Sequence, residues 1–205
     1  MNKKNAKKAL LLVLCAILLV VASVMGTLAY LTDSKEIQNT FAVGKVKITL
    51  DETVVNPDGT DKDDPAVRTA TGNEYLLIPG STYKKDPIVH IEEGSESCYV
   101  FIKVVNNIES VEAAGATDIE AQIAANGWTA LDAENHPGVY HKVWEKGTSD
   151  RDLETFAEFK IDGSATNDSL AGIGTKTIVI TAYAIQKTNI ADAATAWAAL
   201  NPATP

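Results

Sequence analysis

The sequence predicts a mainly β protein, an antiparallel β-sandwich that carries one or two short helices and follows a signal-peptide helix. Two observations favour this fold class. Short segments of alternating apolar or β-branched residues recur along the chain, and clusters of turn residues separate them. Segments with helical spacing are few and short, which is typical of a sandwich rather than of a sheet with helices on both faces.

The first 29 residues have the composition of an export signal. Four lysines near the amino end precede an apolar stretch at 9–25, and small residues follow at Thr27 and Ala29. We expect a signal peptidase to cut between Ala29 and Tyr30. Because the lysines hold the amino end in the cytoplasm, the rest of the chain is expected to be secreted and to meet the membrane only through this segment. The apolar stretch is longer than the roughly 7–15 residues of a usual signal core, so an uncut anchor is the alternative.

The exported part is strongly acidic and contains one cysteine. Residues 1–29 hold four of the 18 Lys and Arg and none of the 27 Asp and Glu, so their removal changes the net charge from −9 to −13. This charge opposes binding to nucleic acid, which is held mainly by Lys and Arg on phosphates. Cys98 has no second cysteine left to pair with, so no intramolecular disulfide is expected. We interpret Cys98 as a buried, inert thiol on a strand.

The first half of the sandwich is predicted from its patterns in order. Alternating apolar residues at 46, 48 and 50 predict a first strand, and the acidic, turn-rich residues 51–72 predict an exposed loop. Residues 82–91 and 98–105 both have strand composition. A short polar turn at 93–95 lies between them, so the pair is predicted to form an antiparallel hairpin.

The second half contains both predicted helices. Residues 117–126 have helical spacing, with Thr117 as the cap and Gly127 as the end. The alanine-rich residues 189–200 predict a closing helix capped by Asn189. Four further strands are predicted, at 128–131, 139–144, 156–161 and 175–186. The expected organisation is an extended segment at 30–44, one sandwich domain at 45–200 and a short tail at 201–205.

Two neighbouring segments resemble a known family. Residues 26–33 (GTLAYLTD) and 39–48 (NTFAVGKVKI) are similar to the start of the TasA and camelysin family of exported proteins, which have SipW-type signal peptides. A looser similarity continues at 78–85 (IPGSTYKK) and at 182–186 (AYAIQ). The resemblance implies a jelly-roll sandwich and, for the best-known relatives, a fibre subunit of the extracellular biofilm matrix.

In such fibres the freed amino-terminal segment of one subunit completes the sheet of its neighbour. An extended segment can pair with an exposed sheet edge through main-chain hydrogen bonds while alternate side chains fill pockets. The apolar residues of the candidate donor strand are Tyr30, Leu31, Ile37 and Phe41. The same segment could instead be a flexible tail or the first strand of its own sheet, and these alternatives stay open.

The leading hypothesis is a non-enzymatic extracellular structural protein, surface-associated or self-assembling with matrix partners. The family also includes camelysin, so a secreted or membrane-tethered metalloprotease is the first alternative. The second alternative is an exported accessory domain that binds another surface protein.

A search for catalytic motifs nominates no catalytic residue. His90, His136 and His141 lack the spacing of a helical zinc motif and are interpreted as surface or packed histidines. No cofactor is expected. Calcium is the alternative, because an acidic run offers carboxylate oxygens that could bind it, although the run lacks EF-hand spacing. The residues of this run are Asp58, Asp61, Asp63 and Asp64.

Overall fold

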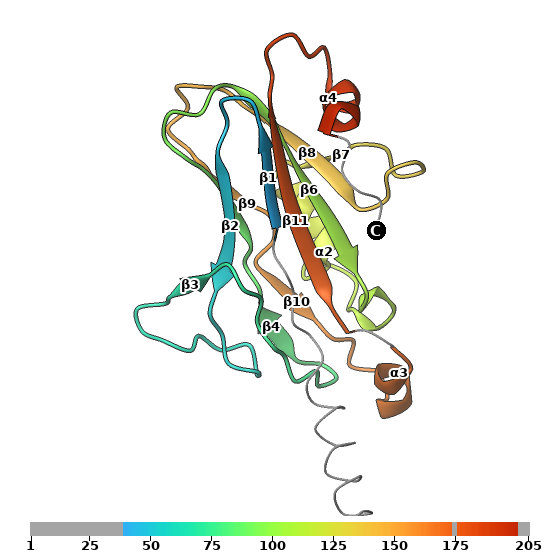
Figure 1. The fold of residues 1–205 in the computed structure, drawn as a ribbon. Helices are drawn as coiled ribbons and strands as arrows, with labels where there is room; N and C mark the ends of the chain where they lie inside the picture. Colours follow the sequence, from blue (N-terminus) through green and yellow to red (C-terminus); the bar gives the residue numbers. More distant parts are fainter. Residues whose placement is uncertain (1–38, 174–175, 201–205) are drawn as a thin grey trace, which may run out of the picture. The chain divides into compact units, whose positions relative to one another are not determined.

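The computed structural model describes residues 39–173 and 176–200, which form two main sheets packed face to face (Figure 1). The predicted signal segment and the tail at 201–205 lie outside the described residues. The larger sheet has five strands, in the order β1 (Asn39–Val43), β11 (Ile178–Gln186), β6 (Cys98–Asn106), β8 (Val139–Trp144) and β7 (Thr129–Ala130). Its pairs are antiparallel except for β1, which runs parallel to β11.

The second sheet has four strands and is extended by a separate strand pair. Its order is β3 (Arg68–Thr69), β2 (Ile48–Thr53), β5 (Ile88–Ile91) and β9 (Asp152–Glu154), and all of its pairs are antiparallel. The separate pair joins β4 (Thr82–Lys84) to β10 (Glu158–Lys160). The described helices are η1 (Glu109–Val111), α2 (Ile119–Ala125), α3 (Asn167–Gly172) and α4 (Ala193–Leu200).

The main core lies between the two sheets. Alternate residues of the long strands point inward, so that Val100 and Ile102 of β6 meet Leu50 of β2 and Val89 of β5 in one buried cluster. Helix α2 adds Ile119 and Ile123 to this cluster. The prediction of a mainly β sandwich is confirmed, with three described α-helices in place of the one or two expected.

Helix α4 lies beside the five-stranded sheet (Figure 1). A second, smaller apolar cluster lies between α4 and the outer face of this sheet. Trp197 of α4 packs on Phe101 and Tyr183, with ring centroids 5.1 and 5.2 Å apart. Helix α4 begins later than the predicted residue 189. Asn189 has a φ of +64° and does not cap the helix; the Asp192 carboxylate instead accepts a hydrogen bond from the backbone of Thr195.

Two predictions about the first half are wrong. Residues 51–53 continue β2 with Glu52 and Thr53 buried, so the exposed loop begins later than predicted; residues 61–67 are exposed as expected. The predicted hairpin between 82–91 and 98–105 does not form. The first segment is broken at 85–87, where Pro87 lacks an N–H, and its second part pairs with β2 and β9 while β6 pairs in the opposite sheet.

Two further differences concern the region around α2. The predicted cap, Thr117, is one residue early: the side chain of Asp118 accepts the bond from the backbone of Ala121, and Gly127 follows the helix with a φ of +78°. Strands β3 and β9 and helices η1 and α3 were not predicted, because each is short. The other predicted strands are present in the expected ranges, and β6 ends one residue later, at Asn106.

Candidate functional site

One edge of the five-stranded sheet is formed by β1, and the other by β7. This strand pairs with β11 along its full length, from Asn39 opposite Thr181 to Val43 opposite Ile185. The other side of β11 is paired with β6 over all nine residues. In the described chain β1 is therefore the first strand of its own sheet, which is one of the alternatives left open by the sequence. Strand β1 starts at Asn39, the first residue that the structure describes.

A short link carries the chain from β1 into the opposite sheet. Gly44 has a φ of +88°, and a Cβ atom there would lie 3.0 Å from the side chain of Gln186. The side chain of Gln186 also accepts a hydrogen bond from the Lys45 backbone at 3.2 Å. Four residues, 44–47, separate β1 from β2. These two strands belong to different sheets. If β1 dissociated from β11, it would therefore rotate about this link.

The remaining residues of the candidate donor strand and of the cleavage site lie mostly outside the described residues. Phe41 is in β1, whereas Tyr30, Leu31 and Ile37 precede residue 39, as do Thr27 and Ala29. Among the described helices, none has the length and apolar character needed to cross a membrane.

The acidic loop does not bring its four aspartates together around one point. Asp58 accepts hydrogen bonds from Thr60, and Asp61 forms an ion pair with Lys84 at 2.7 Å. Within residues 39–173 and 176–200, no group of three or more His, Cys, Asp or Glu side chains is placed to hold a metal ion.

The three histidines occupy different surroundings. His136 is exposed and its ring packs against that of Trp197 in a T-shaped arrangement, and His141 lies on the outer sheet face beside Phe101. Burial lowers the pKa of His141. His90 lies on β5 between the carboxylates of Asp51 and Asp152.

Cys98 is fully buried in β6, as predicted. Burial, with a smaller effect of the Glu145 charge, raises the pKa of its thiol to about 12. A thiol in this state is a poor nucleophile.

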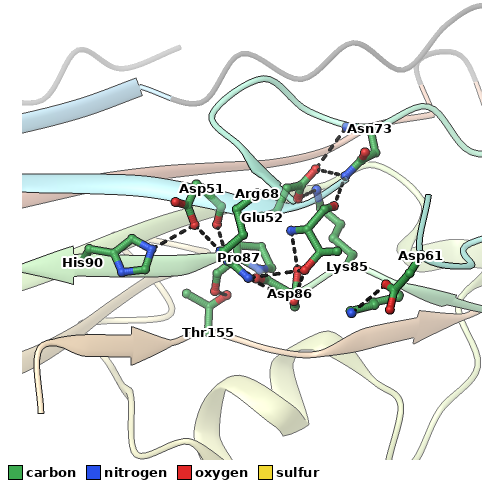
Figure 2. Close-up of polar contacts among 12 residues, drawn as sticks. Asp51, Glu52, Asp61, Arg68, Asn73, Lys85, Asp86, Pro87, His90 and Thr155 are labelled. Atoms are coloured by element: carbon green, nitrogen blue, oxygen red, sulfur yellow. Dashed lines mark hydrogen bonds and ion pairs between the residues drawn. The ribbon is translucent and has the colours of Figure 1, made fainter. Parts of the chain in front are cut away.

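A charged cluster that the sequence did not reveal joins β2, β3 and β5 (Figure 2). Asp152 of β9 joins this cluster through His90. Arg68 donates to the carboxylates of Asp51 and Asp86 and to the main-chain oxygens of both residues. Asp51 also faces His90, with its carboxylate 2.9 Å from Nε2. The chemistry available here is proton exchange at His90, and the ion pairs fix the short strand β3 to β2.

Beside it is a buried triad formed by Glu52, Asn73 and Lys85 (Figure 2). One oxygen of the Glu52 carboxylate is 2.6 Å from Nζ of Lys85, and the other accepts hydrogen bonds from the backbone and side chain of Asn73 at 3.0 and 2.8 Å. The side chains of Glu52 and Lys85 are 0% and 1% exposed. The signal for Glu52 was present in the sequence, because continuing the inward alternation of Ile48 and Leu50 by one step reaches residue 52.

Comparison with known proteins gives no assignment: no family model matches the chain, and no curated protein and no solved structure is significantly similar to it.

Proposed function

We propose that the mature chain is a non-enzymatic extracellular structural protein whose copies assemble by exchanging the amino-terminal strand. The family resemblance of residues 26–33 and 39–48 supports this role, and the jelly-roll form of the sandwich belongs to the same proposal. The observation that carries it is the position of β1. Five residues at the start of the described chain hold the sheet edge beside β11 through parallel pairing.

Strand exchange follows from the hydrogen bonding of β11. If β1 leaves, one side of the centrally placed β11 loses its main-chain partners, and unpaired buried backbone groups are unfavourable. The vacancy is therefore refilled, either by the chain's own β1 or by the same strand of another copy. Both pairings have the same backbone partners, so the choice between them depends on the link at 44–47 and on protein concentration.

Exchange of a terminal strand produces an open assembly. Each copy gives its β1 to one neighbour and receives a β1 from another, which is a head-to-tail contact. Such a contact builds a filament unless its rotation closes a ring. The strongly acidic exported chain stays soluble as single subunits and resists non-specific association, which leaves the specific strand contact to drive assembly.

The test uses the exported chain, residues 30–205, purified and concentrated. Electron microscopy and size analysis are expected to show filaments. A variant lacking residues 30–43 is expected to stay non-filamentous, and a synthetic peptide of residues 30–43 is expected to bind it and to cap filaments of the intact chain.

A second variant separates strand exchange from association through surface apolar residues. Leu76 and Ile78 are exposed and precede β4, away from β1 in sequence and sheet. The double substitution Leu76→Lys and Ile78→Lys should leave filaments unchanged. Filaments that persist without residues 30–43 would refute strand exchange. A chain that remains monomeric, binds zinc and cleaves casein would support the metalloprotease alternative, and a monomer without activity the accessory-domain alternative.

A further inference from the structure

The buried triad brings an amine, an amide and a carboxylate together away from water. Lys85 and Asn73 donate to different oxygens of the one Glu52 carboxylate, at 2.6 and 2.8 Å. All three residues are buried. A primary amine beside a primary amide can form a new amide with release of ammonia, provided that a neighbouring group moves the protons.

We propose that Lys85 and Asn73 become joined by an intramolecular isopeptide bond, formed by the folded chain itself with Glu52 as the proton carrier. The bond would connect the segment after β3 to the segment between β4 and β5. It does not depend on strand exchange, because all three groups belong to one chain and lie inside its fold.

The nucleophile is the neutral amine of Lys85. A proton passing along the 2.6 Å bond from Nζ to Glu52 leaves a neutral amine beside a neutral acid. Burial disfavours a pair of charges more than it disfavours this neutral pair, since both ions must give up their hydration. A desolvated lysine is an established way to obtain a nucleophilic amine in proteins.

The electrophile is the side-chain carbonyl carbon of Asn73. Its oxygen accepts a hydrogen bond from the backbone N–H of Val55 at 3.0 Å, which would stabilise the negative charge that develops there as the amine attacks. The amide nitrogen donates to Glu52 and, at 2.8 Å, to the main-chain oxygen of Thr53. The side-chain amide of Asn73 is therefore fixed by both of its ends. Its oxygen lies at the Val55 N–H, and its nitrogen, which is the leaving group, lies at Glu52, the proton carrier.

The atoms balance without an external reactant. The bond between Nζ of Lys85 and Cγ of Asn73 forms, and the bond between Cγ and Nδ2 of Asn73 breaks. One hydrogen of the attacking amine passes to the leaving nitrogen, which departs as ammonia and takes with it the proton held by Glu52, so that ammonium leaves and the carboxylate is restored. No group is oxidised or reduced.

The cross-link would give the fold a covalent constraint that a disulfide cannot give, since Cys98 has no second cysteine to pair with in the exported chain. It closes the chain between residues 73 and 85, which restricts the unfolded state as a disulfide does. For a loop of this length in a domain of this size, we expect the melting temperature to be higher by about 10 °C than in a variant without the bond.

Intact-mass measurement of the denatured exported chain tests the proposal directly. The wild type should weigh less than its sequence by one ammonia. Trypsin can cut between Asn73 and Lys85 only after Lys84, so digestion should give one branched peptide that contains both residues, with no cleavage after Lys85.

Variants identify the chemistry. Asn73→Asp would release water instead of ammonia and give the same cross-linked product, so its mass after reaction should equal that of the reacted wild type. Glu52→Gln and Lys85→Met should have their full sequence masses. Lys84→Met is the matched control, because Lys84 lies next to Lys85 but pairs with Asp61 at the surface, and it should keep the loss of ammonia.

The wild-type measurement decides the question even if a triad variant does not fold. A folded, purified wild type with its full sequence mass and two separate tryptic peptides would overturn the proposal and leave the triad as a buried ion pair. Loss of ammonia with a branch at a residue pair other than Asn73 and Lys85 would overturn it equally.

Discussion

Nδ1 of His90 lies 2.7 Å from a carboxylate oxygen of Asp152, which connects β5 to the edge strand β9 by a side-chain bond in addition to the backbone ladder. The opposite ring nitrogen faces Asp51. Both nitrogens can donate at once only when the ring is protonated. The protonated form is therefore the one that joins the three strands.

Stability is expected to depend on pH through this histidine. Burial by itself lowers the pKa of His90, but the hydrogen bonds that its ring donates to the carboxylates of Asp51 and Asp152 outweigh this effect, and the pKa lies above the ordinary 6.5. The folded state thus binds the proton more tightly than the unfolded state, so the contribution is complete below pH 6.5 and is lost as the pH rises through the raised pKa. Because Asp152 is largely exposed, we expect this contribution to the unfolding free energy to be at most about 1 kcal/mol.

Urea unfolding of the wild type and of His90→Gln, from mildly acidic to mildly alkaline pH, measures this effect. The difference in unfolding free energy between the two proteins should shrink as the pH rises. A difference that stays constant over the whole range would show that the two carboxylates do not favour the protonated ring.

Removal of the Trp197 side chain should weaken the outer cluster. Trp197→Ala deletes the packing of α4 on Phe101 and Tyr183, and we expect a loss of about 2–4 kcal/mol in unfolding free energy. Limited proteolysis should then cut first near α4 while the main core persists. The control is Trp197→Phe, which keeps an aromatic ring and should cost less; equal losses in both variants would contradict the packing explanation.

Gly138 is required by a close backbone contact. Its φ is +71°, and a Cβ atom would lie 2.2 Å from the main-chain oxygen of Val104. Gly138→Ala must therefore displace β6 or the turn before β8, at a cost of roughly 2–3 kcal/mol or more. Gly147→Ala is the matched control, with a φ of +97° and open space around the added atom, so it should cost only about 1 kcal/mol. Thermal unfolding of both variants gives the comparison.

The cap of α2 can be assigned by a pair of substitutions. Asp118→Ala removes the acceptor for the Ala121 backbone and should destabilise the protein by about 1 kcal/mol, whereas Thr117→Ala should have little effect. Chemical unfolding of the two variants measures the difference. A larger loss of unfolding free energy in Thr117→Ala would show that Thr117 is the cap, as the sequence predicted.

The thiol of Cys98 should be inert while the protein is folded. With a pKa raised to about 12 and a buried position, it should not react with a thiol reagent at neutral pH until denaturant is added. A time course of labelling with and without denaturant checks this. Rapid labelling of the folded protein would mean that β6 opens locally.

The sequence predicted the strands best where local alternation and burial agree. Ile48 and Leu50 of β2 point inward as expected, and β6 and β11 are long enough for their composition to identify them. The pairing of β5 could not be predicted, because the partner of a strand depends on which sheet buries its side chains and not on its nearest neighbour in sequence.

The alternation of Ile48 and Leu50 reaches residue 52, but the partners that Glu52 has in the buried triad could not be predicted from local patterns. A glutamate after an apolar alternation is usually exposed. Glu52 is buried because Asn73 and Lys85 reach it from 21 and 33 positions away in the chain. The charged cluster likewise combines residues from four strands, and each residue alone has the sequence context of a solvated side chain.

The parallel pairing of β1 and β11 also constrains the order of events during synthesis. The first described strand to leave the ribosome pairs with the last, and at bacterial or eukaryotic elongation rates the interval between them is on the order of ten seconds. Throughout that time the amino-terminal strand has no place in the sheet. The five-stranded sheet therefore cannot be completed until the final strand has been made.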